Sequence, residues 1–472
     1  MARGKKHTKK NTTSIGPETS MLPEDYTIAS IESASLESIF TLPNPITNDN
    51  YNHYEEGEEE DDEHGHDKSY EFLTDAITDV SDVPTEKRSK VRLMALKAAF
   101  KALTCHATCP ESWLLVQHRM SDIVHACVWS VLKSSKATEQ YAACRCLEAM
   151  SVVLGSNEEE FVEEVMDSLM KAVKATGKDG QVRSAALRAL SMSLFVCSSS
   201  GSSSTLFVMG LCGEVCRERW RGEDVVPYLR ATALRCWSLL ATTVDDVYVA
   251  GEESNILPRL QECLDHSDVE LRAAAGECVA LIHETRLNMG LEDGEGDEIR
   301  NASERKYRRG SWDGTEWEMI MDELKQRVSE LAVEYGHHMS KKAKKEQRSI
   351  FRDIVATVVD DEEPSHVVSF RGGDIMLNSW HDIVQLDFVR HCLQQGFQIQ
   401  LMTNPTLYDI FVGANGGMLS EAVDRLSQLE KRLYMSKTSD VAKAKDKNLR
   451  KKRLNRENQK NAFLSADGDY IS

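Results

Sequence analysis

Apolar residues recur at helical spacing along most of the chain from Tyr70 onward. One pattern returns several times: an apolar residue, an Arg, and then a run of small and apolar residues. The copies lie roughly 40 to 50 residues apart, which is the period of units made of two or three helices. The copies begin at Val91, Ala143, Val182, Leu229 and Leu271, the second being degenerate. The pattern therefore predicts a helical repeat array.

Small residues occupy one register of these copies, where helices of neighbouring repeats must approach closely. We predict that these positions pack between repeats: Ala95, Cys146, Ala186, Ala233 and Ala275. We expect the Arg after the first apolar position to pair within or between repeats rather than to contact a ligand, at Arg92, Arg183, Arg230 and Arg272. The predicted fold is mainly α, with an armadillo- or HEAT-type α-solenoid over 70–287.

A linker over 288–315 is predicted after the array, and two helices follow it. The first spans Glu316 to His338 with one apolar face. The second spans Lys341 to Val359 and carries an apolar stripe on one face. Its other face carries cations at three- and four-residue steps, which makes them phosphate-contact candidates: Lys341, Lys344, Lys345, Arg348 and Arg352.

The next segment predicts a small α+β unit, so that a C-terminal module spans 316–436. Val367 to Phe370 and Ile375 to Leu377 flank a Gly-containing connection, which indicates a β-hairpin. A helix around Val384 to Gln395 follows, and the alternation over Phe397 to Leu401 predicts a third short strand. Asn404 followed by a proline indicates the start of another helix.

The two ends of the chain differ in charge. Residues 1–69 hold no sustained apolar period and end in an acidic run, so we expect disorder there. The formal net charge is −19, yet the stretch from Lys437 to Lys460 holds ten Lys or Arg against three Asp or Glu, a balance of +7. This basic tail over 437–472 follows an apolar helical stripe that stops near Tyr434. Its candidate RNA or phosphate contacts are Lys443, Lys445, Lys447, Arg450, Lys451, Lys452, Arg453 and Arg456.

Composition excludes several classes of protein. The longest apolar runs fall far short of the roughly 20 residues that a membrane span needs. The N-terminus is basic with no apolar stretch behind it, which argues against secretion and places the twelve cysteines in a reducing compartment as thiols. We therefore expect a cytoplasmic or nuclear protein without membrane partners or a small-molecule substrate.

Metal and catalytic interpretations are weak. His64 and His66 have ligand-like spacing, and further histidines lie near Cys105 and Cys109, at His106, His118 and His125. Cys212 and Cys216 form another close pair. Neither Cys pair has a second pair at finger spacing, and an ordinary helical core accounts for them. We expect no catalytic residue, no metal and no cofactor.

Three segments resemble the interferon-related developmental regulator family: the last repeat at Arg272–Leu281, the run Lys345–Asp353, and the Lys- and Arg-rich tail. The resemblance covers roughly 70–460. It implies an armadillo-like protein without catalysis, described in the family both as a nuclear transcriptional co-regulator linked to histone-deacetylase co-repressors and as a factor that binds ribosomes and silences translation. The chain departs from animal members in its long acidic N-terminal segment and in the spacing of its basic tail.

Two functions are thus open for a non-enzymatic regulator of gene expression. In the first, the basic tail and the 341–352 face bind the ribosome or RNA and control translation. In the alternative, a nuclear co-regulator binds chromatin co-repressor proteins, with regulatory partners on the solenoid surface. The tail also resembles a nuclear localisation signal, and a solvated end with no partner is the third interpretation.

Overall fold

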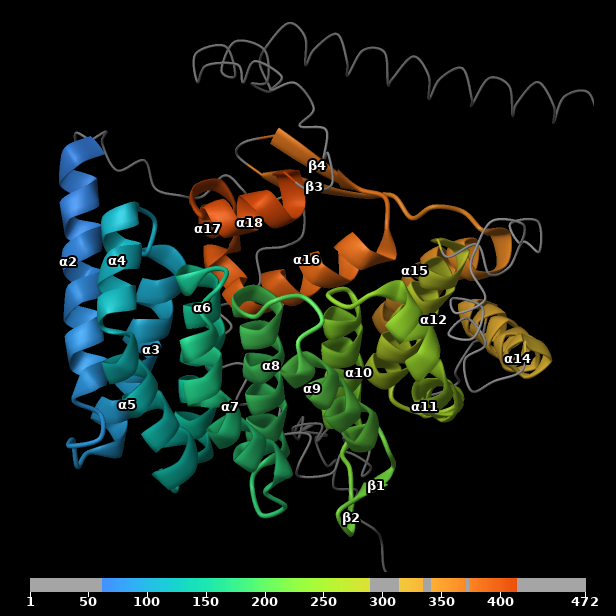
Figure 1. Ribbon diagram of the computed structural model, residues 1–472, viewed down its shortest axis with the longest axis horizontal. Helices are drawn as coiled ribbons and strands as arrows, with labels where there is room; N and C mark the ends of the chain where they lie inside the picture. The colour runs from blue at the N-terminus through green and yellow to red at the C-terminus, as the bar shows by residue number, and fades with distance from the viewer. Residues whose placement is uncertain (1–61, 289–313, 334–340, 371–372, 414–472) are drawn as a thin grey trace, which may run out of the picture. The chain divides into compact units, whose positions relative to one another are not determined.

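The computed structural model of the protein describes residues 62–288, 314–333, 341–370 and 373–413 (Figure 1). The chain divides into two compact units. The first combines residues up to 364 with 379–407, and the second combines 365–378 with the residues from 408 onward. Almost all described residues belong to the first unit, which is helical.

Five helices stack in chain order to form the middle layer of this unit. They are α3 (Ser89–Cys105), α6 (Ala137–Leu154), α8 (Gly180–Cys197), α10 (Pro227–Ala241) and α12 (Val269–Asn288). Each of them holds one copy of the repeated pattern. Each also packs against a helix of an outer layer: α2 (Asp62–Ser81), α5 (Met120–Lys133), α7 (Glu159–Lys174), α9 (Ser203–Val215) and α11 (Asp246–Leu264). The predicted α-solenoid is confirmed.

Local sequence explains where several of these helices begin. Asp179 accepts a hydrogen bond from the Gln181 backbone N–H at the start of α8, and Ser202 does the same for Thr205 at the start of α9. Proline occupies the first turn of α10 and of the short helix α4 (Pro110–His118), where a missing N–H costs nothing. Between α9 and α10, β1 (Arg219–Trp220) and β2 (Glu223–Asp224) form a small antiparallel hairpin.

Further helices of the first unit pack against the array. α14 (Gly314–Val333) contacts α11, and α15 (Lys341–Asp360) contacts α12 and α14. The predicted amphipathic helices at these positions are confirmed. α16 (Trp380–Leu393), the 3₁₀ turn η1 (Gln394–Gly396), α17 (Phe397–Thr403) and α18 (Pro405–Tyr408) then lie along the middle layer (Figure 1). α14, α15, α16 and α17 therefore pack with the repeats, whereas the sequence analysis grouped these residues in a C-terminal module.

In the second unit, β3 (His366–Phe370) and β4 (Gly373–Leu377) form the predicted hairpin. The strands are antiparallel, with His366 opposite Leu377 and Val368 opposite Ile375. The π-helical turn η2 (Asp409–Gly413) also belongs to this unit.

Two expectations from the sequence are wrong. Phe397 to Leu401 is not a strand but helix α17, because Phe397, Gln400 and Leu401 at helical spacing are the residues that become buried. Five residues are too few for periodicity alone to separate the two structures. Residues 62–69 belong to helix α2, although we expected disorder up to 69. Because the packed part of α2 already forms a helix, each residue that extends it toward the N-terminus gains one backbone hydrogen bond without a new nucleation step.

Candidate interaction surfaces

The residues 380–407, here called the covering segment, lie against four middle-layer helices. α16 contacts α12, α10 and α6, while α17 and η1 contact α3 (Figure 1). The segment therefore runs against the chain direction of the array, from its last repeat back to its first. A layer of the chain's own helices thus occupies much of a face on which a repeat array of this kind would hold an extended partner.

The N-terminal end of the covering segment is fixed by polar contacts from α12, from α15 and from the residue that caps the C-terminal end of α10. The Glu284 carboxylate on α12 accepts hydrogen bonds from the backbone N–H groups of Trp380 at 2.6 Å and His381 at 3.2 Å. Trp380 Nε1 donates to Thr357 Oγ1 of α15 at 2.9 Å, and His381 Nε2 lies 2.8 Å from the Thr242 carbonyl oxygen. A carboxylate beside the first N–H groups of a helix also interacts favourably with the helix dipole.

The other end of the covering segment supplies donors to the ends of two middle-layer helices. Gln400 Nε2 donates to the carbonyl oxygens of Leu103, Thr104 and Ala107, at 3.3, 3.2 and 2.9 Å. Asn404 Nδ2 donates to the Val152 carbonyl oxygen at 2.9 Å. Leu103 and Thr104 lie in the last turn of α3, and Val152 in that of α6, where carbonyls have no partner within the helix. These two amides therefore complete the C-terminal ends of α3 and α6.

A buried charge cluster lies beneath the C-terminal end of α16. Arg145 and Glu148 of α6 are 0% and 1% exposed, and they form an ion pair with each other. Arg188 of α8 binds the same carboxylate at 3.1 Å. Arg145 also donates to the carbonyl oxygens of His391 at 3.1 Å and Cys392 at 2.8 Å, at the end of α16. Two arginines thus share one carboxylate, and the negative end of the α16 dipole offsets part of the remaining positive charge.

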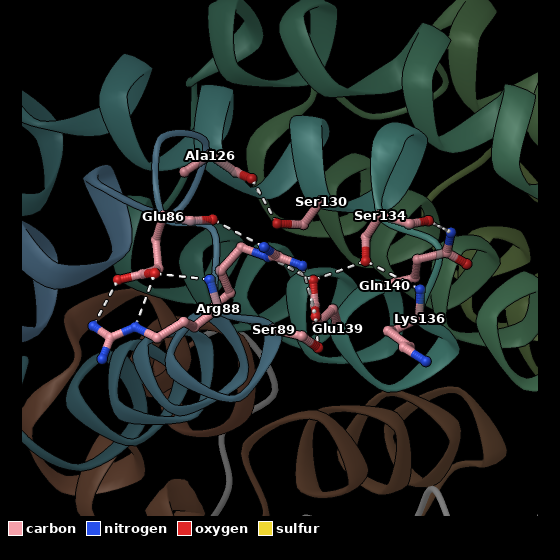
Figure 2. Close-up of polar contacts among 10 residues, drawn as sticks. Glu86, Arg88, Ser89, Ala126, Ser130, Ser134, Lys136, Glu139 and Gln140 are labelled. Carbon is pink, nitrogen blue, oxygen red and sulfur yellow. Dashed lines mark hydrogen bonds and ion pairs between the residues drawn. The ribbon is translucent and has the colours of Figure 1, made fainter.

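The arginines of the repeated pattern make the structural contacts that we predicted. Arg92 of α3 pairs with Glu139 of α6 at 2.9 Å. The Ser89 and Ser134 hydroxyls donate hydrogen bonds to the same carboxylate (Figure 2). The other three donate to carbonyl oxygens: Arg183 to Val173 at 3.0 Å, Arg230 to Cys216 at 2.8 Å, and Arg272 to His266 at 2.7 Å. The prediction of pairing within or between repeats is confirmed for these four arginines.

The five small residues of the repeat register are all buried: Ala95, Cys146, Ala186, Ala233 and Ala275. Cys146 Sγ lies 3.0 Å from the Leu96 carbonyl oxygen, so α6 approaches α3 closely at this point. Gly276 of α12, next to the last of these positions, allows α15 to approach α12 closely in the same way. A Cβ at this position would lie 2.8 Å from the Ile354 side chain and 3.1 Å from that of Phe351.

The basic helix α15 has one buried and one exposed face. Phe351, Ile354 and Val358 are buried, whereas Arg348 and Arg352 are exposed. The three preceding phosphate-contact candidates lie in the first turns of the same helix: Lys341, Lys344 and Lys345. The candidates in the tail lie outside the described residues: Lys443, Lys445, Lys447, Arg450, Lys451, Lys452, Arg453 and Arg456. The predicted helical stripe that stops near Tyr434 also lies outside them.

The thiols are poorly suited to nucleophilic chemistry. Eleven of the twelve cysteines are buried, and Cys105 is half-buried. Burial raises the pKa of Cys263 to about 11 and that of Cys278 to about 12. A thiol in this state holds its proton at neutral pH, and the thiolate is the reactive form.

Within the described ranges, no group of three or more His, Cys, Asp or Glu side chains is arranged to hold a metal ion. His106, one of the histidines singled out in the sequence, instead has its ring Nδ1 3.3 Å from Ser69 Oγ, and its ring packs at a 45° tilt against that of Phe72, with the centroids 4.7 Å apart. None of the helices among these residues is long and apolar enough to cross a bilayer.

The covering segment is the part of this surface that the sequence did not reveal. Gln400 falls in the segment expected to be a strand, and Arg145 lies in the degenerate repeat copy. Gln385, Gln400 and Asn404 are all buried, and buried polar groups are expected to have hydrogen-bond partners. The sequence does not separate them from exposed polar residues of the same segment, such as Gln395.

Solved structures with some likeness to the chain are also repeat proteins. The archaeal HEAT-like repeats protein from Thermococcus onnurineus NA1 aligns at 12% identity over 61% of this chain and 98% of that one, with a TM-score of 0.35. Kap121p, a karyopherin, aligns at 13% identity over 81% of this chain and 38% of that one, with a TM-score of 0.37. These likenesses are too weak to add to the fold described above.

Sequence comparison is more informative. Interferon-related developmental regulator 1 of Mus musculus is 26% identical over 454 residues, which is 92% of each chain. The human protein of that name is 25% identical over 440 residues, and regulator 2 of Mus musculus is 25% identical over 410 residues, covering 80% of this chain and 83% of that one. The family model described as interferon-related developmental regulator matches residues 45–359, more than half of the chain. The protein is therefore a member of the interferon-related developmental regulator family.

Proposed function

We propose that the protein is a non-enzymatic regulator that controls translation by binding the ribosome or its RNA through the basic tail, with the exposed arginines of α15 as a second contact. The charge distribution carries the proposal. A chain with a net charge of −19 concentrates a balance of +7 between Lys437 and Lys460, and a polyanion is the partner that such a stretch attracts.

The contacts of α15 support its part in this proposal. Its apolar stripe packs against α12 and α14, so the helix is held in place by the repeats. Arg348 and Arg352 lie one turn apart on its exposed side. A helix with its apolar side fixed presents its cations at a defined spacing, which reduces the entropy lost when phosphates bind.

The covering segment bears on the alternative function. A co-regulator that holds an extended partner along the middle layer would have to displace α16 and α17. That displacement would expose the buried charges of Arg145, Glu148 and Arg188. Protein partners are therefore better sought on the outer layer or at the ends of the array.

The first test is co-sedimentation of the tagged full-length protein with ribosomes on sucrose gradients at low and high salt. A chain that ends at Ser436 and the double variant Arg348→Glu with Arg352→Glu test the two basic contacts. Lys133→Glu with Lys136→Glu, at exposed lysines elsewhere, is the matched control. We expect salt-sensitive migration with ribosomal fractions that is lost on truncation, weakened by the arginine pair and unchanged in the control.

A binding titration with a single-stranded RNA measures the number of phosphate contacts. The slope of log affinity against log salt should become shallower by about 1.4 in the arginine double variant, because each phosphate neutralised on single strands contributes about 0.7. Migration in light fractions at both salt concentrations, for full-length and truncated chains alike, would remove the ribosome from the proposal and favour the nuclear co-regulator.

A further inference from the structure

Helix α3 is the member of the middle layer with an exposed basic and apolar side. Lys90, Val91, Met94 and Lys101 are exposed and Lys97 is half-buried, and we call these five residues the α3 face. Met94 is 61% exposed and Val91 is 36% exposed. In α6, by contrast, every residue from Glu139 to Val153 is buried.

The position of α3 explains why this face is open. α3 packs against α2 and α6, while α17 and η1 contact it near its C-terminal end, where Gln400 donates to Leu103 and Thr104. α3 is the first middle-layer helix, so the described chain has no earlier repeat to pack on it. A terminal repeat that only faced water would be expected to present polar residues there. Met94 and Val91 depart from that expectation.

The charge of α3 is of one sign. The sequence Ser89–Cys105 contains Lys90, Arg92, Lys97 and Lys101 but no Asp or Glu. Arg92 is paired with Glu139 of α6, and Lys101 Nζ lies 5.8 Å from the centroid of the Phe72 ring on α2. Lys90, Lys97 and Lys101 supply the positive charge of the face. This face stands out in a protein whose net charge is −19.

The spacing of the face defines what fits it. Lys90, Lys97 and Lys101 follow each other at two-turn and one-turn steps, with Val91 and Met94 between them, over a length of about 17 Å. A helix of about three turns with carboxylates on either side of an apolar stripe would meet both kinds of residue. A nucleic acid would satisfy the lysines but would leave Met94 and Val91 without an apolar partner.

We propose that the α3 face is a docking site for an acidic amphipathic helix of a partner protein. The proposal is independent of ribosome or RNA binding by the tail and α15. The chain's own acidic run is a poorer match, because Glu55–Glu63 consists of carboxylates and one glycine and holds no apolar side chain. It would neutralise the lysines and leave the apolar residues uncovered.

The test uses the full-length protein and a fluorescein-labelled synthetic peptide of roughly 16 residues, about four helical turns, with Glu and Leu at helical spacing. A scrambled peptide of the same composition is the control for general charge attraction. Fluorescence anisotropy then compares wild type with Met94→Gln, with Lys97→Glu plus Lys101→Glu, and with the control pair Lys133→Glu plus Lys136→Glu.

We expect the amphipathic peptide to bind more tightly than the scrambled one. Met94→Gln should weaken binding about tenfold through lost apolar burial, and the lysine double variant should weaken it at least as much. The control pair should leave the affinity unchanged. These side chains are exposed or half-buried, so an unchanged thermal unfolding midpoint would show that the variants are folded.

Three results would overturn the proposal. Equal binding of the scrambled peptide would reduce the face to a general attraction for acidic chains. Peptide binding that is detected only with a truncated chain beginning at Asp62 would show that the protein's own acidic run occupies the face. Binding of a single-stranded RNA that is lost in the lysine double variant and retained in Met94→Gln, with no peptide binding, would assign the face to nucleic acid.

Discussion

Helices α3 and α6 are neighbours in one layer and carry copies of one repeat, yet they end up in opposite environments. α6 is buried along nearly its whole length, and its charged residues are neutralised by partners from α3, α8 and the end of α16. α3 keeps three lysines and two apolar side chains on an exposed face. α6 has a middle-layer helix on each side, α3 and α8, whereas α3 has no earlier described repeat packed on it. The position of a repeat in the array therefore decides whether its polar residues serve stability or are available to a partner.

The largest effect on stability should come from removing the carboxylate of the buried charge cluster on α6. Glu148→Gln leaves Arg145 and Arg188 buried without their shared counter-charge, which should cost about 3–5 kcal/mol of the free energy of unfolding. Chemical denaturation measures this loss. The matched control is Glu270→Gln, whose carboxylate pairs with Arg235 but is 68% exposed, with an expected change within about 0.5 kcal/mol. Equal effects of the two substitutions would contradict a buried cluster.

A smaller effect should follow from loosening the covering segment where it meets α3. Gln400→Ala removes a donor from the carbonyl oxygens of Leu103, Thr104 and Ala107, which should cost about 1–3 kcal/mol. Hydrogen exchange should become faster in α17 and in the last turn of α3. Gln395→Ala, at an exposed position nearby, should change neither quantity. Unaltered exchange in Gln400→Ala would mean that the amide is not what holds α17 in place.

The N-terminal end of the covering segment should respond weakly to pH. Burial by itself would lower the pKa of His381, but hydrogen bonds with Asp382 and the Thr242 carbonyl outweigh it and raise the pKa above 6.5. A raised pKa in the folded state means that the protonated form stabilises the fold below pH 6.5, and that this stability is lost as the pH rises through the folded-state pKa.

Because the His381 side chain is 44% exposed, the expected change is below about 1 kcal/mol. Urea unfolding of wild type and His381→Gln on both sides of pH 6.5 would measure it. The advantage of wild type over the variant should shrink as the pH rises. An advantage that grows instead would reverse the assigned sign.

The smallest effect on stability is expected from substitutions on the exposed α3 face. Met94→Gln and Lys90→Glu alter a face that no other described helix covers, so each should change the free energy of unfolding by no more than about 0.5 kcal/mol. Thermal unfolding followed by circular dichroism is sufficient to check this. A loss as large as that of Gln400→Ala would show that the face is packed in solution, and it would withdraw the docking proposal.

The pattern of the sequence was sufficient for the elements of the array. Val91, Val182, Leu229 and Leu271 each start a copy of the repeat within a middle-layer helix, and the hairpin at His366–Leu377 was also foreseen. The charge asymmetry of the ends is likewise a property of sequence alone. These features depend on local spacing and composition, which a single chain displays directly.

The covering segment was decided by tertiary structure. Gln400 and Asn404 look like ordinary polar residues until the unpaired carbonyls of α3 and α6 lie opposite them. Phe397 to Leu401 becomes a helix because of the surface on which it packs. The pattern of five residues does not by itself distinguish a helix from a strand. The charge cluster joins Arg145 to carbonyls almost 250 positions later in the chain. Contacts over such separations follow from the balance of desolvation, dipoles and hydrogen bonds in the folded chain, which no local pattern records.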